Sequence, residues 1–148
     1  MTQQTWRTRL ARFGEAVRLA TPASAESVEG LTDALGVTLP AELHALLLES
    51  DGVADRYGAG LVWPAAEIVR QNRAFRTNPE FRALYMPFDA LLFFGEAGNG
   101  DQFFFRILDG AVRGPDVYVW AHETDSRVWA APSLEALLER RLAGAAEW

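Results

Sequence analysis

The chain has 148 residues, of which 49% are hydrophobic and 23% are charged, and it contains no cysteine. This composition predicts one globular domain over residues 1–148 and excludes a disordered chain, a disulfide framework and a thiolate zinc site. The formal net charge of −6 disfavours binding to nucleic acid and favours a basic partner.

The start of the chain carries arginines among its apolar positions, which is untypical of the apolar core of a signal peptide. No stretch approaches the roughly 20 apolar residues that a membrane-spanning helix requires. We therefore expect a cytoplasmic protein that has no membrane partner.

Apolar residues at helical spacing predict three helices in the N-terminal third, over residues 6–18, 25–35 and 40–50. The apolar stripe of the first helix consists of Trp6, Leu10, Phe13 and Val17. Ser24 can cap the second helix, Gly36 can end it, and Pro40 suits the first turn of the third.

The middle of the chain is less regular. Gly58 and Gly60 separate two short apolar stretches between residues 53 and 64, which indicates a small hairpin or a loop. A fourth helix is expected over residues 64–76, and Asn78-Pro79 should end it and begin a short turn that runs through Leu84.

From residue 91 the pattern changes to strands. The apolar run 91–94 and the alternating segments 102–108 and 117–123 predict three strands, and 127–130 predicts a fourth. The turns between them are short and rich in Gly, Asp and Ser, so consecutive antiparallel pairing is expected. Ser133 can cap a last helix over residues 133–142. The fold class is therefore α+β, a single domain with a mostly antiparallel sheet, formed chiefly by residues 91–130, and helices packed around it.

Three segments in this order resemble the SUKH superfamily, which includes a fungal regulator of cell-wall assembly and many bacterial immunity proteins. They are residues 35–40 running into Asp51-Gly52, residues 92–101, and residues 117–123 followed by the last helix. The resemblance spans about residues 25–142. It implies a protein-binding domain without a shared catalytic apparatus, so we expect no enzyme activity, no cofactor and no metal.

The chemistry of individual motifs agrees with this reading. In the glycine-rich loop 95–101, the Gly98-x-Gly100 pair is followed by neither the third glycine nor the lysine of nucleotide-binding loops, so the glycines, with Asp101, are interpreted as forming a tight turn. His122 and Glu123 point to opposite faces of a strand, which disfavours a metal site or a general base.

Most aromatic residues of the predicted strands are interpreted as core. Phe104, Tyr118 and Trp120 are the exceptions, because polar residues interrupt their strand faces. If helices leave that face uncovered, these side chains could anchor a partner.

The leading functional hypothesis is an immunity protein that neutralises a cognate bacterial toxin by direct stoichiometric binding, with a basic domain such as a nuclease as the partner. Its expected rim is acidic and polar and consists of Glu96, Asn99, Asp101, Glu123 and Asp125. One alternative is an intracellular regulatory adaptor or scaffold, and a weaker one is a metal-dependent hydrolase that uses carboxylates. Gene neighbourhood would separate the first two, and metal-dependent activity would revive the third.

Overall fold

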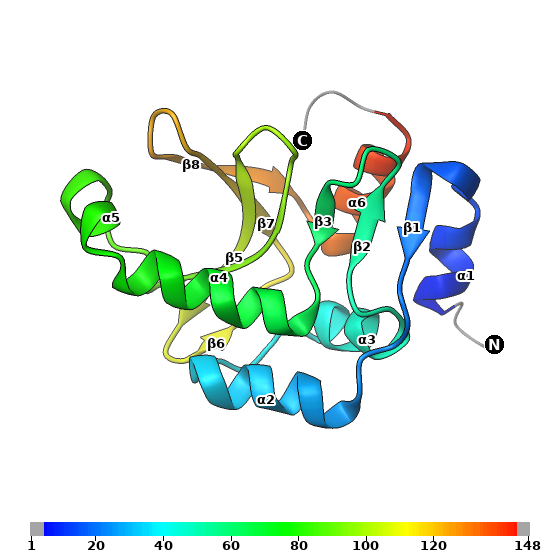
Figure 1. Ribbon diagram of the computed structural model, residues 1–148, viewed down its shortest axis with the longest axis horizontal. Helices are drawn as coiled ribbons and strands as arrows, with labels where there is room; N and C mark the ends of the chain where they lie inside the picture. Colours follow the sequence, from blue (N-terminus) through cyan, green and yellow to red (C-terminus); the bar gives the residue numbers. More distant parts are fainter. Residues whose placement is uncertain (1–4, 145–148) are drawn as a thin grey trace.

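The computed structural model describes residues 5–144, so the outermost four residues at each end of the expected domain lie outside the described part. Across residues 5–144 the fold is α+β, with six α-helices and two antiparallel sheets of three and five strands. This confirms the predicted fold class. The two sheets lie side by side and the helices surround them (Figure 1).

The larger sheet has the strand order β4-β5-β7-β8, with the short β6 pairing with β5. Its strands are β4 (Leu91–Glu96), β5 (Gln102–Leu108), β6 (Ala111–Val112), β7 (Val117–Ala121) and β8 (Ser126–Ala131). All pairings in this sheet are antiparallel, as the short turns predicted. The sheet therefore lies almost entirely within the expected 91–130.

Two helices cover one face of this sheet. They are α4 (Ala65–Thr77) and α5 (Pro79–Leu84). Phe75 of α4 packs against Phe93 and Trp120, with ring centroids 4.6 and 5.4 Å away. Asn72, also on α4, is fully buried and accepts a hydrogen bond from the Phe93 N–H while donating to the Phe93 carbonyl. These contacts fasten α4 to the centre of the sheet.

The opposite face is equally apolar. Phe94 and Phe105 stack with centroids 4.6 Å apart, and both are fully buried together with Phe103. The C-terminal helix α6 (Leu134–Leu142) packs against β8 and begins at Ser133, whose hydroxyl accepts from the Ala136 N–H as expected for an N-cap.

The smaller sheet has the order β1-β2-β3 and consists of β1 (Val17–Leu19), β2 (Val53–Asp55) and β3 (Gly60–Val62). The pairing of β2 with β3 confirms the hairpin that the glycines indicated. The chain leaving β3 then meets β4, because the Trp63 N–H donates to the Phe94 carbonyl over 2.7 Å. Contact is so close that a Cβ on Gly95 would lie 1.8 Å from the Leu61 carbonyl oxygen. The two sheets are thus held together through backbone.

The expected helix over residues 6–18 is wrong in its second half. Helix α1 (Trp6–Ala11) ends early, a single 3-10 turn follows at Gly14–Ala16, and Val17 begins β1. Gly14 adopts a left-handed backbone conformation with φ +56°, which a helix cannot continue through. Val17 still packs against the core, but from a strand that pairs with β2.

The other helices correspond to those predicted, with one addition. Helices α2 (Ala25–Leu35), α3 (Ala41–Glu49) and α4 lie within one or two residues of their expected bounds. The segment expected as a short turn through Leu84 is instead the helix α5, in which the Asn78 side-chain oxygen accepts from the Glu80 N–H and Pro79 occupies the first position. Over the described range, no helix is both long and apolar enough to span a bilayer.

Candidate functional site

The loop between β4 and β5 is a tight turn, as its glycines predicted. Gly98 and Gly100 have φ values of +94° and +98°, in the region that favours glycine. The Asn99 side-chain oxygen accepts from the Asp101 N–H, and the Ala97 N–H donates to the Asp101 carbonyl. The Asn99 side chain therefore helps to close this turn.

Asp101 joins this turn to the end of β7. Its carboxylate accepts from the His122 N–H over 3.1 Å and lies 2.7 Å from His122 Nδ1. Asp101 is only 9% exposed, and a Cβ on Gly100 would approach the His122 ring to 2.7 Å. Asp101 thus holds two neighbouring strand ends together, which leaves little of its carboxylate for a partner.

Asp125 plays the same role in the β7–β8 turn. Its carboxylate accepts from the Met86 N–H (2.9 Å), the Trp120 Nε1–H (2.8 Å) and Arg127 (3.1 Å). Burial alone would raise the pKa of Asp125, but these hydrogen bonds and the Arg127 charge outweigh it and lower the pKa below its ordinary value. The turn is thereby fixed to the segment that precedes β4.

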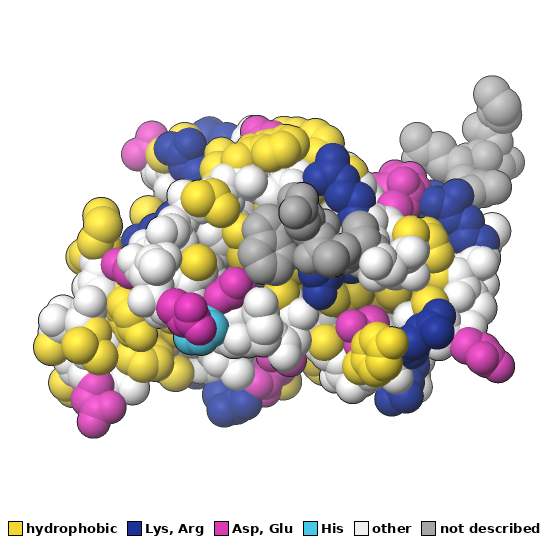
Figure 2. All heavy atoms as spheres, turned by 90° about the horizontal axis from the view of Figure 1, so that it is seen from above, with side chains coloured by type: hydrophobic (Ala, Val, Ile, Leu, Met, Phe, Trp, Pro, Cys, Tyr) yellow, Lys and Arg dark blue, Asp and Glu magenta, His cyan; other side chains and the backbone are white. Residues whose placement is uncertain are grey.

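The other acidic and polar residues of the expected rim are more accessible. Glu123 and Asn99 are exposed at the same end of the sheet, and Glu96 is half-buried with its carboxylate 3.4 Å from the Trp63 indole nitrogen. Figure 2 looks onto this end of the molecule and shows acidic side chains separated by polar, apolar and basic ones. The structure therefore brings the five rim residues to one end of the sheet, but as a mixed polar surface.

The three aromatic residues singled out in the sequence differ in exposure. Trp120 is 3% exposed and lies within about 5.4 Å of the rings of Phe75, Tyr85 and Phe88, while Phe104 is buried as well. Helices α4 and α5 cover this part of the face, so the condition for a surface anchor is not met at Trp120 or Phe104. Tyr118 is half-buried and stacks on Phe104 at 5.5 Å.

Trp129, which was interpreted as core, is instead 52% exposed on the edge strand β8. It pairs with Tyr118 across the strands, and its indole donates to Asp116 over 3.0 Å. Arg106 lies on the same face, 5.8 Å from the Tyr118 ring. The signal in the sequence was the position of Trp129 on the last strand of the sheet, where only one neighbouring strand is available.

The described part of the chain offers no assembled metal site, since no three His, Asp or Glu side chains within residues 5–144 are grouped to hold an ion. His122 is engaged by Asp101, and His44 lies on α3.

A comparison with protein-family models supports the resemblance seen in the sequence. The model SUKH_6, described as SMI1-KNR4 cell-wall, matches residues 25–138, which is 114 of the 148 residues. No curated protein sequence matches the chain. The match covers α2 through most of α6 and includes both turns that carry the polar rim, so the chain belongs to the SMI1-KNR4 family of the SUKH superfamily.

Proposed function

We propose that this protein is a non-enzymatic binding domain that acts as an immunity protein and neutralises a cognate bacterial toxin by direct, one-to-one contact. The observation that carries the proposal is the family match over residues 25–138, because membership of the SUKH superfamily is consistent with immunity or regulatory proteins that work by binding.

The polar end of the larger sheet is suited to such contact because it is preformed. Asp101 and Asp125 fasten the two turns to neighbouring segments, so Glu96, Asn99 and Glu123 are presented on a backbone that is already ordered. A preformed surface loses little conformational entropy on binding. The net charge of −6 would steer a basic partner, such as a nuclease domain, toward this rim.

Affinity requires an apolar anchor in addition to the rim. Tyr118 and the exposed Trp129 provide one, flanked by Arg106, and these three residue types are enriched at the centres of protein interfaces. Tyr118 on β7 lies four residues before His122, which directly follows this strand, and the two are about 13 Å apart at roughly 3.3 Å per residue. The anchor and the rim therefore fit within one interface of about 800 Å² per partner.

If a gene adjacent to the one for this chain encodes a toxin, the test is co-expression with that toxin, together with a pull-down and binding kinetics. The double variant Glu96→Arg and Glu123→Arg should slow association, and Trp129→Ala should speed dissociation. The matched control is Glu29→Arg and Asp33→Arg on α2. Both pairs replace two acids by two arginines and change the net charge from −6 to −2, so only a local effect distinguishes them.

Survival that persists when the two proteins no longer associate would contradict occlusion. If both double variants slow association equally, charge acts only at long range and the rim is not part of the interface.

A regulatory adaptor is the second candidate, and the cell-wall description of the family model favours it. In that case the protein would bind a housekeeping partner and would give no protection against a toxin. Capture of the same partner from strains with and without the adjacent gene would indicate the regulatory role. Capture only from strains that carry the adjacent gene would indicate the immunity role.

A further inference from the structure

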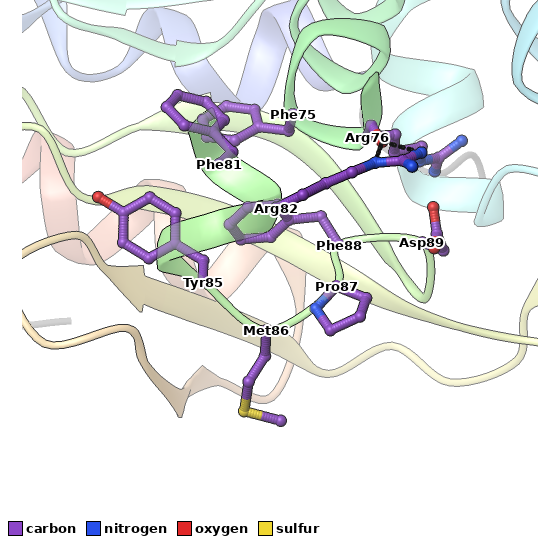
Figure 3. A pocket seen from close by; sticks show the side chains of 9 residues that line it. All are labelled: Phe75, Arg76, Phe81, Arg82, Tyr85, Met86, Pro87, Phe88 and Asp89. Atoms are coloured by element: carbon purple, nitrogen blue, oxygen red, sulfur yellow. Dashed lines mark hydrogen bonds between the residues drawn. The ribbon is translucent and has the colours of Figure 1, made fainter. Parts of the chain in front are cut away.

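A pocket with a volume of 330 Å³ lies between the end of α4, helix α5 and residues 85–89 (Figure 3). Its volume is at the lower end of the range of about 300–1,000 Å³ that is usual for ligand sites. None of the rim or anchor residues discussed above lines it.

One end of the pocket is aromatic. Phe75 and Phe81 stack with ring centroids 5.1 Å apart, and Phe88 meets Phe75 edge to face at 5.2 Å. Tyr85 lies 5.8 Å from Phe88. Because these rings pack against one another, they form a stiff apolar wall that a flat group can stack against.

The other end is charged. Figure 3 shows the side chains of Arg76, Arg82 and Asp89 together, away from the rings of Phe81 and Tyr85. Arg82 donates from Nε and Nη2 to the backbone carbonyl of Arg76, and the side chains of both arginines line the pocket. Two cations and one carboxylate leave this end with a net positive charge.

Arg76 is incompletely compensated. Its Nη2 donates to the Leu91 carbonyl over 3.1 Å, but its buried Nε has no hydrogen-bond partner among the residues that the structure describes. Burial lowers the pKa of Arg76, and the charge of Asp89 opposes that effect only in part. Because the charge of Arg76 is only partly compensated and Arg76 lines the pocket, an anion at this end would be stabilised by that charge.

We propose that this pocket binds a flat apolar group that carries a carboxylate, with the body against the aromatic wall and the carboxylate on Arg76 and Arg82. Arginine suits this role because its planar fork matches a carboxylate. A cationic ligand would be repelled by the two guanidinium groups. The proposal goes beyond the toxin-binding function, since it involves different residues and a different ligand charge.

Two sources offer this chemistry, a free aryl-alkyl acid and the C-terminal aromatic residue of a polypeptide. The probes are 3-phenylpropionate, its uncharged amide, and a short glycine peptide that ends in a free phenylalanine carboxylate. Binding to the full chain is followed by calorimetry and by the indole N–H signal of Trp120, whose ring lies 5.2 Å from Tyr85 and 5.3 Å from Phe88.

Saturable binding is expected, with the acid bound at least about tenfold more tightly than the amide, because the charge-assisted hydrogen bonds are lost in the amide. Tighter binding of the peptide than of 3-phenylpropionate would support the pocket and identify a polypeptide C-terminus as the source. The reverse order would support it and identify a small acid.

The variant Arg82→Met should weaken binding of the acid by roughly tenfold and leave binding of the amide unchanged. The matched control is Arg73→Met, which removes an exposed arginine of α4 that does not line the pocket. Absence of saturable binding by all three probes, equal affinity for acid and amide, or equal loss in the two variants would overturn the proposal.

Discussion

Replacing Asp125 with alanine removes the acceptor that holds the β7–β8 turn to the segment before β4. The Met86 N–H and the Trp120 indole would each lose a hydrogen bond, and Arg127 would lose its ion pair. Leaving a buried donor unsatisfied costs about 1–3 kcal/mol, and water can replace part of that here because the Asp125 side chain is 18% exposed. Alanine is also less tolerant than aspartate of the local φ of +57°.

We expect the free energy of unfolding to fall by about 3 kcal/mol in total, which corresponds to a Tm lower by roughly 6–12 °C for a chain of this size. Urea unfolding followed by tryptophan fluorescence measures it. The matched control is Asp116→Ala, which also removes a carboxylate bonded to a tryptophan indole, but at the surface. Its cost should stay below about 1 kcal/mol.

The effect should depend on pH in a defined direction. Because the folded-state pKa of Asp125 is lowered, the carboxylate stabilises the fold at pH values above its unfolded pKa of about 3.9. That contribution is lost as the pH falls through the lower folded-state pKa. The stability difference between wild type and Asp125→Ala should therefore narrow below about pH 4. Equal unfolding midpoints for the Asp125 and Asp116 variants, or a difference that stays constant from neutral pH to about pH 2, would refute the reasoning.

Three further predictions test the fold around the site. Gly100→Val should lower the free energy of unfolding by about 2 kcal/mol or more, since φ is +98° and the new Cβ would approach the His122 ring to 2.7 Å. The control Gly114→Ala should be nearly neutral, because a Cβ there meets nothing within 4 Å. Thermal unfolding measures both. Asn72→Ala should cost about 3 kcal/mol in urea unfolding, because it leaves both backbone groups of one buried β4 residue unpaired, and a cost under about 1 kcal/mol would contradict that role. Trp120→Ala should lower the free energy of unfolding by about 3–5 kcal/mol because Trp120 is buried, and Trp129→Ala by less than about 1 kcal/mol because Trp129 is exposed. The opposite order in calorimetry would contradict this difference in burial.

Much of the fold could be predicted because local signals and tertiary structure agree. In the strand 117–121 aliphatic residues alternate with aromatic ones, and short turns separate this strand from the neighbouring ones. The strand pairs antiparallel with both neighbours, as expected. The first helix was wrong because the spacing from Trp6 to Val17 fits one continuous helix. Only the left-handed conformation of Gly14 and the pairing of β1 with β2 reveal the strand.

The candidate site could be predicted less well, because exposure depends on distant elements. Trp120 and Trp129 lie on adjacent strands of the same sheet, yet α5 and residues 85–88 cover only the first. Nothing in the strand sequence indicates where that helix ends. Asp101 and Asp125 were likewise expected at the surface because carboxylates usually are, whereas here buried donors compensate for their burial.

Because of strand β1, the folding unit begins earlier in the chain than the segment that is similar to the family. The family model begins at residue 25, but β2 has β1 on one side and β3 on the other, and Trp6 and Leu10 are buried against the core. A fragment cut at the start of the family match would expose the β2 edge and remove two large core side chains. Such a fragment would be prone to edge-to-edge association. Polypeptides for biophysical work should therefore begin before Trp6, whatever the extent of the recognisable motif.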